Sequence, residues 1–242
     1  MPHRAIIFFD QLGCGRSDTP ANIEDYSIDF VVEDVYLLIQ TLHLHTFHLY
    51  GQSFGGIVAY EYLKKHHCHH DATDYENKRY ECMSVTLSST PTSVALVENE
   101  AQRLIEELTT EDAAVVDYEE DDAKKTAGER FHAQHVCRTA EIPAPLLNAR
   151  AHAGTVWRGT TAVADYVATA PGEEEKELPP ALVIRGEYDF VTEDCVVGWK
   201  KDVWNHDNVR EVVLERCAHH GLLEQGKVYG GIVGSFCCEH DV

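Results

Sequence analysis

The stretch from Thr46 to Tyr60 constrains this chain more than any other. It reads as a short β-prone run, a Gly-Gln-Ser-Phe-Gly turn and an apolar helical pattern. In such a strand–turn–helix unit the central serine, Ser53, sits on a strained turn with its hydroxyl clear of the sheet. Side chains at Gly51 or Gly55 are expected to collide with the folded-back backbone. The pattern predicts a nucleophile at Ser53, and the alternative is a structural turn.

The same turn places the backbone N–H of Phe54 at the start of a helix. Such a group points toward negative charge that develops beside Ser53. Phe54 is therefore predicted to donate a hydrogen bond to an oxyanion.

The rest of the chain alternates strand and helix patterns, which predicts an α/β fold with a mostly parallel sheet. Ser27 is a plausible cap for a helix to about His43, with Val31, Val35, Leu38 and Leu42 on its buried face. A final helix is predicted over 225–236. Continuous or alternating apolar runs predict strands buried in the sheet at 5–9, 83–88, 181–184 and 209–214.

The region from residue 91 to 177 differs from its surroundings. It contains an amphipathic helical pattern near 97–108, an acidic run and no convincing strand. We therefore expect one domain in three segments: a first part of the core at 1–90, a helical cap at 91–177 and a second part of the core at 178–242.

Composition excludes several functional classes. The formal net charge of −21 disfavours nucleic acid and anionic membranes as partners and makes a cationic or neutral substrate easier to accommodate. The eight cysteines are scattered without a C-x-x-C pair, so free thiols in a reducing compartment, the cytoplasm, are expected. The cluster at 66–71 contains four histidines and a cysteine but lacks the spacing of a fixed metal site, so a solvated loop is expected there.

Two further candidates follow predicted strands. Asp189 comes just after the strand at 181–184, and His219 follows the strand at 209–214. Because the carboxyl ends of parallel strands meet at one edge of a sheet, both side chains can converge on Ser53. A histidine can take the proton of the serine while a carboxylate orients the ring, which predicts acyl transfer through an acyl-enzyme.

This assignment leaves alternatives open. Glu187 and Asp194 are alternative acids to Asp189, and His220 is an alternative base to His219.

The motifs together resemble those of the proline iminopeptidase-like α/β hydrolases. They are Asp-Gln-x-Gly-x-Gly-Arg-Ser at 10–17, Gly-x-Ser-x-Gly-Gly at 51–56, Gly-Glu-Tyr-Asp-x-Val-Thr at 186–192, and Cys-Ala-His at 217–219 with Glu224 five residues after the histidine. The serine–acid–histidine order also agrees. The resemblance implies the α/β-hydrolase fold, a serine aminopeptidase or amidase acting on small peptides or amides, no metal and no organic cofactor. The glutamate spacing of the family selects His219 over His220.

The chain departs from the family pattern in two ways. Relatives have several strands and an HGGPG-type oxyanion loop before the 10–17 motif, so an incomplete gene product is expected. Many relatives hold the substrate amine with carboxylates, one often directly after the catalytic acid, where this chain has Phe190. A carboxylesterase with the same machinery and a non-catalytic remnant are therefore the alternatives. The sequence does not give the oligomeric state.

Overall fold

The computed structural model describes residues 4–68, 80–114, 127–158, 160–172, 177–204 and 208–241. Within these ranges the chain forms a four-stranded parallel sheet in the order β1-β2-β3-β4. The strands are β1 (Thr46–Gln52), β2 (Glu81–Ser88), β3 (Ala181–Gly186) and β4 (Val209–Leu214). The strands predicted at 83–88, 181–184 and 209–214 are therefore confirmed.

Helices connect and cover the strands. The α-helices are α1 (Ile28–Thr41), α2 (Phe54–Tyr62), α3 (Val94–Ala114), α4 (Ala127–Phe131), α5 (Ala144–Ala151), α6 (Glu193–Gly198), α7 (Gly221–Glu224) and α8 (Gly226–Glu239). Shorter 3-10 or π-helical turns are η1 (Ile23–Asp25), η2 (Leu63–Cys68), η5 (His132–Val136), η6 (Thr160–Val163) and η7 (Trp199–Val203). The predicted first and last helices are confirmed.

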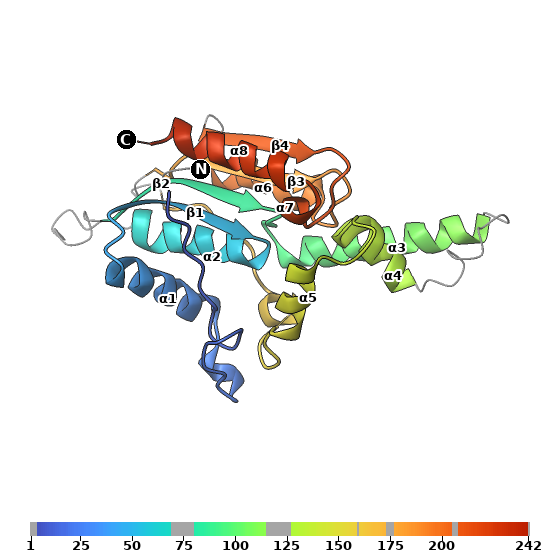
Figure 1. The fold of residues 1–242 in the computed structure, drawn as a ribbon, viewed down its shortest axis with the longest axis horizontal. Coiled ribbons are helices and arrows are strands. Elements are labelled where there is room, and N and C mark those ends of the chain that lie inside the picture. The colour runs from blue at the N-terminus through green and yellow to red at the C-terminus, as the bar shows by residue number, and fades with distance from the viewer. Residues whose placement is uncertain are drawn as a thin grey trace.

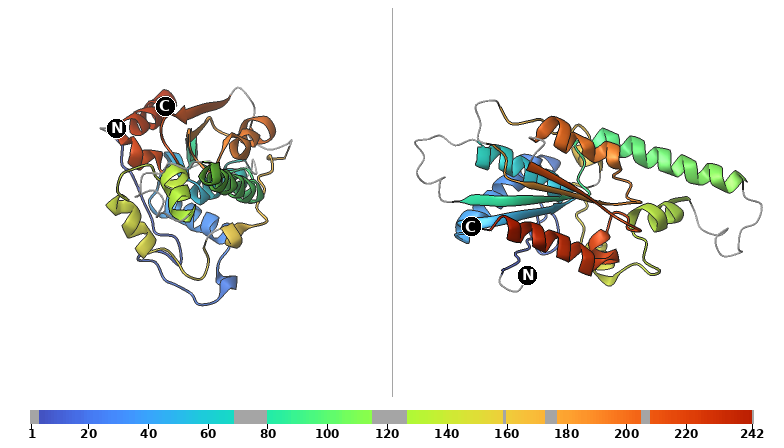
Figure 2. Two further views of the ribbon diagram at one scale, coloured as in Figure 1. Left: turned by 90° about the vertical axis from the view of Figure 1, so that its right-hand side faces the viewer. Right: turned by 90° about the horizontal axis from the view of Figure 1, so that it is seen from above.

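The centre of the sheet, formed by β2 and β3, is buried on both faces. Alternate residues of β3 belong to two separate apolar clusters, since side chains of a strand point to opposite faces in turn. Ala181 and Val183 pack with residues of α1, α2 and α6, whereas Leu182 and Ile184 pack with α8. Figure 2 shows the same arrangement from above, with α8 on one side of the strands and α2 and α6 on the other.

The segment between β2 and β3 extends beyond the carboxyl ends of the strands. Helices α3, α4 and α5 lie there, past the arrowheads of the sheet (Figure 1). An isolated bridge joins Ser93 to Val167 near the base of this segment. The carboxyl edge of the sheet is thus the end that these helices approach.

The prediction of a buried strand at 5–9 is wrong. These residues have no regular secondary structure, and Phe8 is 85% exposed. A parallel strand needs a hydrogen-bonded neighbour, and in the described part of the chain β1 pairs on one side only, with β2. Apolar composition alone cannot supply that neighbour.

Two smaller expectations are also corrected. Leu42 is 45% exposed because α1 ends at Thr41, and Ile39 is buried on that face instead. His66 and His67 do not lie in a loop, since η2 continues α2 through them and buries His67. The remaining residues of the histidine cluster, at 69–71, lie outside the described residues.

Ser27 caps α1 as predicted, and its hydroxyl accepts a hydrogen bond from the N–H of Phe30 at 3.1 Å. Replacing Ser27 by Ala leaves that N–H without its acceptor, so we expect the free energy of unfolding to fall by ~1 kcal/mol. Ser27→Asp keeps an acceptor and is expected to lose less than half as much. Urea unfolding followed by circular dichroism measures both, and an equal loss in the two variants would contradict the capping role.

Candidate active site

Ser53 occupies a strained turn between β1 and α2. Its backbone has φ 52° and ψ −119°, a conformation that residues with a side chain rarely adopt. Its N–H donates to the carbonyl oxygen of Ser88 at 2.8 Å, which ties the turn to the end of β2. This is the geometry expected of a serine whose hydroxyl projects from the carboxyl edge of a sheet.

The close approach of neighbouring atoms explains two of the glycines around Ser53. A Cβ at Gly51 would lie 2.1 Å from the carbonyl oxygen of Gly55, and one at Gly56 would lie 1.9 Å from Oγ1 of Thr90. The expectation for Gly55 is wrong, because a Cβ there would meet nothing within 4 Å. Gly51 and Gly56 are therefore the positions where the turn excludes a side chain.

Asp189 and His219 are in direct contact. His219 Nδ1 donates to Asp189 Oδ1 at 2.9 Å, and the same oxygen accepts from the N–H of Val191 at 2.9 Å. Asp189 is 2% exposed and His219 is 6% exposed. Because Nδ1 carries the hydrogen of this hydrogen bond, Nε2 of the neutral ring has a lone pair that can accept a proton. The pair has the form of a base held by an orienting acid.

The alternative residues have other partners or positions. Glu187 accepts a hydrogen bond from the N–H of Arg216 at 2.8 Å, and Asp194 is exposed in the first turn of α6. His220 Nδ1 lies 3.2 Å from the side-chain nitrogen of Gln52. The structure thus joins Asp189 to His219 and leaves the alternatives outside that pair.

Gln52 links the serine strand to the histidine loop. Its Nε2 donates to the carbonyl oxygen of His219 at 2.7 Å. A carbonyl oxygen can only accept, so the amide nitrogen must face it, and His220 Nδ1 is then an acceptor for the same NH₂ group. Among the described residues no hydrogen bond joins the Ser53 hydroxyl to His219, so Gln52 is the direct polar link between the two segments.

Glu224 binds the backbone directly before His219. Its two carboxylate oxygens lie 3.2 and 3.0 Å from the N–H of Ala218, the residue before His219. The glutamate that the motif comparison singled out thus holds the backbone that carries the imidazole.

His220 is kept neutral. Burial is the main cause that lowers its pKa to about 4, and the nearby His219 and Arg150 contribute to the same shift. Its ring lies edge-on to that of His219, with centroids 5.4 Å apart. A neutral neighbour places no like charge beside the imidazolium that His219 would form.

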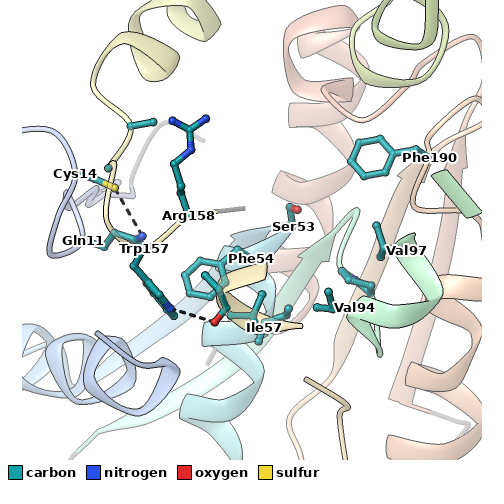
Figure 3. Close-up of a pocket in the computed structure, with 15 residues that line it drawn as sticks. Gln11, Cys14, Ser53, Phe54, Ile57, Val94, Val97, Trp157, Arg158 and Phe190 are labelled. Atoms are coloured by element: carbon teal, nitrogen blue, oxygen red, sulfur yellow. Dashed lines mark hydrogen bonds between the residues drawn. The ribbon is translucent and has the colours of Figure 1, made fainter. Parts of the chain in front are cut away.

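A cavity of about 330 Å³ opens beside Ser53 (Figure 3). Its wall includes Phe54, Ile57 and Val94, together with Trp157 and Phe190. The ring of Phe190 stacks on that of His219, with centroids 4.4 Å apart, so one residue of the cavity wall also contacts the histidine.

Sequence reasoning missed several residues of this cavity. Gln11 and Cys14 come from the loop that contains the 10–17 motif, and Trp157 comes from the segment before β3. A hydrogen bond from Gly15 N–H to the carbonyl oxygen of His152 (3.0 Å) joins these two distant segments. Gln52 lies inside the Gly-x-Ser-x-Gly-Gly motif at 51–56. Nothing in a single sequence shows that its side chain bonds to the loop that carries His219.

No group of three or more potential metal ligands is found among the described residues. Within the described ranges, free thiols are found at positions 14, 82, 137, 195, 217, 237 and 238. None of the helices in those ranges is long and apolar enough to cross a membrane.

Comparison with known proteins agrees with the fold. Residues 2–225 match the model of the alpha/beta hydrolase fold family. The chain belongs to this family. The α/β-hydrolase fold expected from the motifs is therefore confirmed.

Related proteins support the resemblance to the proline iminopeptidases. This α/β hydrolase is 28% identical to a proline iminopeptidase of Saccharolobus solfataricus over 249 residues, which cover 96% of this chain and 75% of the relative. It is also 28% identical to a proline iminopeptidase of Lactobacillus delbrueckii subsp. lactis over 255 residues, which cover 98% and 82%. The crystal structure of a Mycobacterium smegmatis proline iminopeptidase superposes with a TM-score of 0.68 at 20% identity, covering 94% of this chain and 77% of that one. The relatives support a hydrolase.

The glycine geometry of this α/β hydrolase yields a matched test. Gly51→Ala forces a Cβ into the backbone of Gly55, so we expect the free energy of unfolding to fall by at least ~2 kcal/mol. Gly55→Ala places its Cβ in open space in the first turn of α2, where alanine favours the helix, so stability is expected to stay equal or rise. Urea unfolding of both variants measures the difference, and similar losses would contradict the assigned close approach.

The Gln52 contact predicts a titration shift in His220. We expect an apparent pKa of about 4 for this ring by imidazole NMR, with Nδ1 unprotonated above it. Gln52→Met removes the donor that favours the neutral ring, so the pKa of His220 should rise. Gln225→Met serves as a control, since Gln225 binds the carbonyl of Glu215 rather than a ring. A pKa of His220 that Gln52→Met leaves unchanged would contradict the contact.

Proposed function

We propose that this chain is a serine hydrolase in which Ser53, His219 and Asp189 form the catalytic triad. The observation that carries this proposal is the buried hydrogen bond between His219 and Asp189 at the sheet edge where Ser53 occupies its strained turn. The three residues come from separate segments and follow one another along the chain in the serine–acid–histidine order of the family.

The proposed mechanism follows from the atoms available. His219 Nε2 removes the Ser53 proton as Oγ attacks the carbonyl carbon, and Asp189 stabilises the imidazolium through Nδ1–H. The backbone N–H of Phe54, the first residue of α2, donates to the oxyanion. The imidazolium then protonates the leaving group, and water hydrolyses the acyl-enzyme by the reverse sequence of proton transfers.

We propose residues 91–177 as a cap over this site. Val94, Gly154 and Trp157 belong to that segment and line the cavity beside Ser53, which supports the assignment. A cap over the cavity would exclude water and restrict the size of the acyl group.

Two substrate classes have specific support. Relatives named proline iminopeptidase favour release of an N-terminal amino acid, of the proline type, from small peptides or amides. The apolar wall of the cavity favours a carboxylesterase that uses the same residues. A non-catalytic remnant is the remaining alternative, and the labelling experiment below distinguishes it from an enzyme. The free thiols support a reducing compartment such as the cytoplasm as the location.

A fluorophosphonate probe tests the nucleophile. We expect stoichiometric labelling at Ser53, detected by mass spectrometry of the modified peptide, and none in Ser53→Ala. Asp189→Asn should keep the nucleophile but slow labelling by about 10²–10⁴-fold, because it loses the carboxylate that orients His219. Folded protein that takes up no probe would support the remnant, and equal labelling of Ser53→Ala would refute the nucleophile.

A further inference from the structure

The η5 turn (His132–Val136) binds the loop that carries Asp189. His135 Nδ1 lies 2.8 Å from the carbonyl oxygen of Tyr188, the residue directly before Asp189. Because a carbonyl oxygen can only accept, Nδ1 must carry the hydrogen of this bond. The guanidinium of Arg138 adds a second contact, since its central carbon lies 3.9 Å from the centre of the Tyr188 ring. The turn and the residue just beyond it therefore hold the residue that leads into the acid.

The same turn binds the loop that carries His219. The carbonyl oxygen of Val136 accepts a hydrogen bond from the N–H of His220, the residue directly after His219, at 3.2 Å. The ring of Phe131, at the end of α4, lies 5.9 Å from that of Phe190, which stacks on His219. Figure 1 shows the turn after α4 past the carboxyl ends of β3 and β4, near α7. Contacts from this turn thus reach the base as well as the acid.

Two adjacent residues, His135 and Val136, hold the chain beside both members of the His219–Asp189 pair. The planar peptide unit keeps consecutive Cα atoms about 3.8 Å apart. The η5 turn therefore acts as a spacer of fixed length between the loop of the acid and the loop of the base.

We infer that the η5 turn positions the His219–Asp189 pair, and that His135 is a positioning residue of the reaction. The inference rests on the proposed serine hydrolase, because it assigns a role within that reaction. His135 is not among the described residues that line the cavity beside Ser53, so it acts through the pair rather than on the substrate. The segment at 91–177 thus sets the geometry of the pair in addition to lining the cavity.

A direct bond between the two loops limits the effect expected from the turn. The N–H of Tyr188 donates to the carbonyl oxygen of Cys217 at 2.9 Å, so the loops stay joined without η5. Loss of the turn therefore shifts the pair rather than separating it. A displacement of about 1 Å can slow a reaction by about 10²-fold, and we expect about a tenfold loss from the smaller shift here.

Three variants test the role of His135, and thermal unfolding checks that each one folds. His135→Phe keeps a ring beside Phe131 but removes the donor to Tyr188. His135→Asn keeps a side-chain N–H donor close to the position of Nδ1. His152→Phe is the control, because His152 Nδ1 makes a bond of similar length, 2.9 Å, to the carbonyl oxygen of Asn148 in its own helix, α5.

The rate of fluorophosphonate labelling at Ser53 measures the effect on the reaction. We expect His135→Phe to label about tenfold more slowly than the wild type. His135→Asn and His152→Phe should stay within about threefold of the wild-type rate, since each keeps the contact with Tyr188.

The hydrogen between His219 Nδ1 and Asp189 gives a second readout, which a contact that only stabilises the fold would not change. Both residues are almost fully buried, so in the wild type we expect a separate downfield NMR signal that exchanges slowly with water. His135→Phe should speed this exchange by about tenfold well below its melting temperature, whereas His135→Asn and His152→Phe should leave it near the wild-type rate.

Arg138→Gln takes the place of His135→Phe if that variant does not fold. Arg138 is exposed, and the substitution removes its charge from the face of the Tyr188 ring. Labelling at Ser53 should then slow by about threefold, with faster exchange of the His219 hydrogen. Wild-type values for both would overturn the inference.

The outcomes separate this inference from the proposal beneath it. Labelling and exchange at wild-type rates in His135→Phe overturn the inference while the serine hydrolase stands. An equal loss in His135→Asn or His152→Phe also overturns it, because the donor to Tyr188 is then not the cause. A wild type that does not label at Ser53 overturns the serine hydrolase, and the exchange of the His219 hydrogen still decides whether η5 holds the pair.

Discussion

The hydrogen bond between His219 and the buried Asp189 is the interaction on which this site depends. Each residue follows a different strand, and the bond forms because adjacent parallel strands β3 and β4 end at the same edge of the sheet. A carboxylate with almost no exposure is costly to bury without partners, and here the imidazole and a backbone N–H both bind its Oδ1. The pair therefore fixes both the tautomer and the direction of the histidine ring.

Several weaker contacts place this pair relative to Ser53. Gln52 holds the carbonyl oxygen of His219 from the serine strand, and Glu224 holds the preceding N–H from α7. The turn at Ser53 is fixed separately, by the close approach of Gly51 to the backbone of Gly55. The site is thus assembled from backbone positions that the sheet determines and from side chains that lock the loops to it.

Much of this arrangement could be predicted from strand ends. The apolar runs that became β3 and β4 place Asp189 and His219 at one edge, because strand direction and side-chain chemistry are both local properties of the sequence. The prediction of a strand at 5–9 was wrong because strand formation is not a purely local property. Ile6 and Phe8 have the composition of a buried strand, but strand formation depends on a neighbour that composition does not encode.

The cavity was the part least accessible to sequence reasoning. Cys14 and Trp157 are distant in the chain and line one cavity because the loop after residue 10 packs against the segment before β3. The side chain of Gln52 acts through contacts with His219 and His220, which lie 167 and 168 positions away. Such long-range contacts leave no periodic pattern.

A crystal structure of the phosphonylated protein tests the central claim most directly. The account predicts a phosphorus atom bonded to Ser53 Oγ, one phosphonyl oxygen within hydrogen-bond distance of the Phe54 N–H, and His219 Nε2 within hydrogen-bond distance of Ser53 Oγ. A structure in which the adduct forms with the His219 ring directed away from Ser53, or in which the phosphonate sits on another residue, would contradict it.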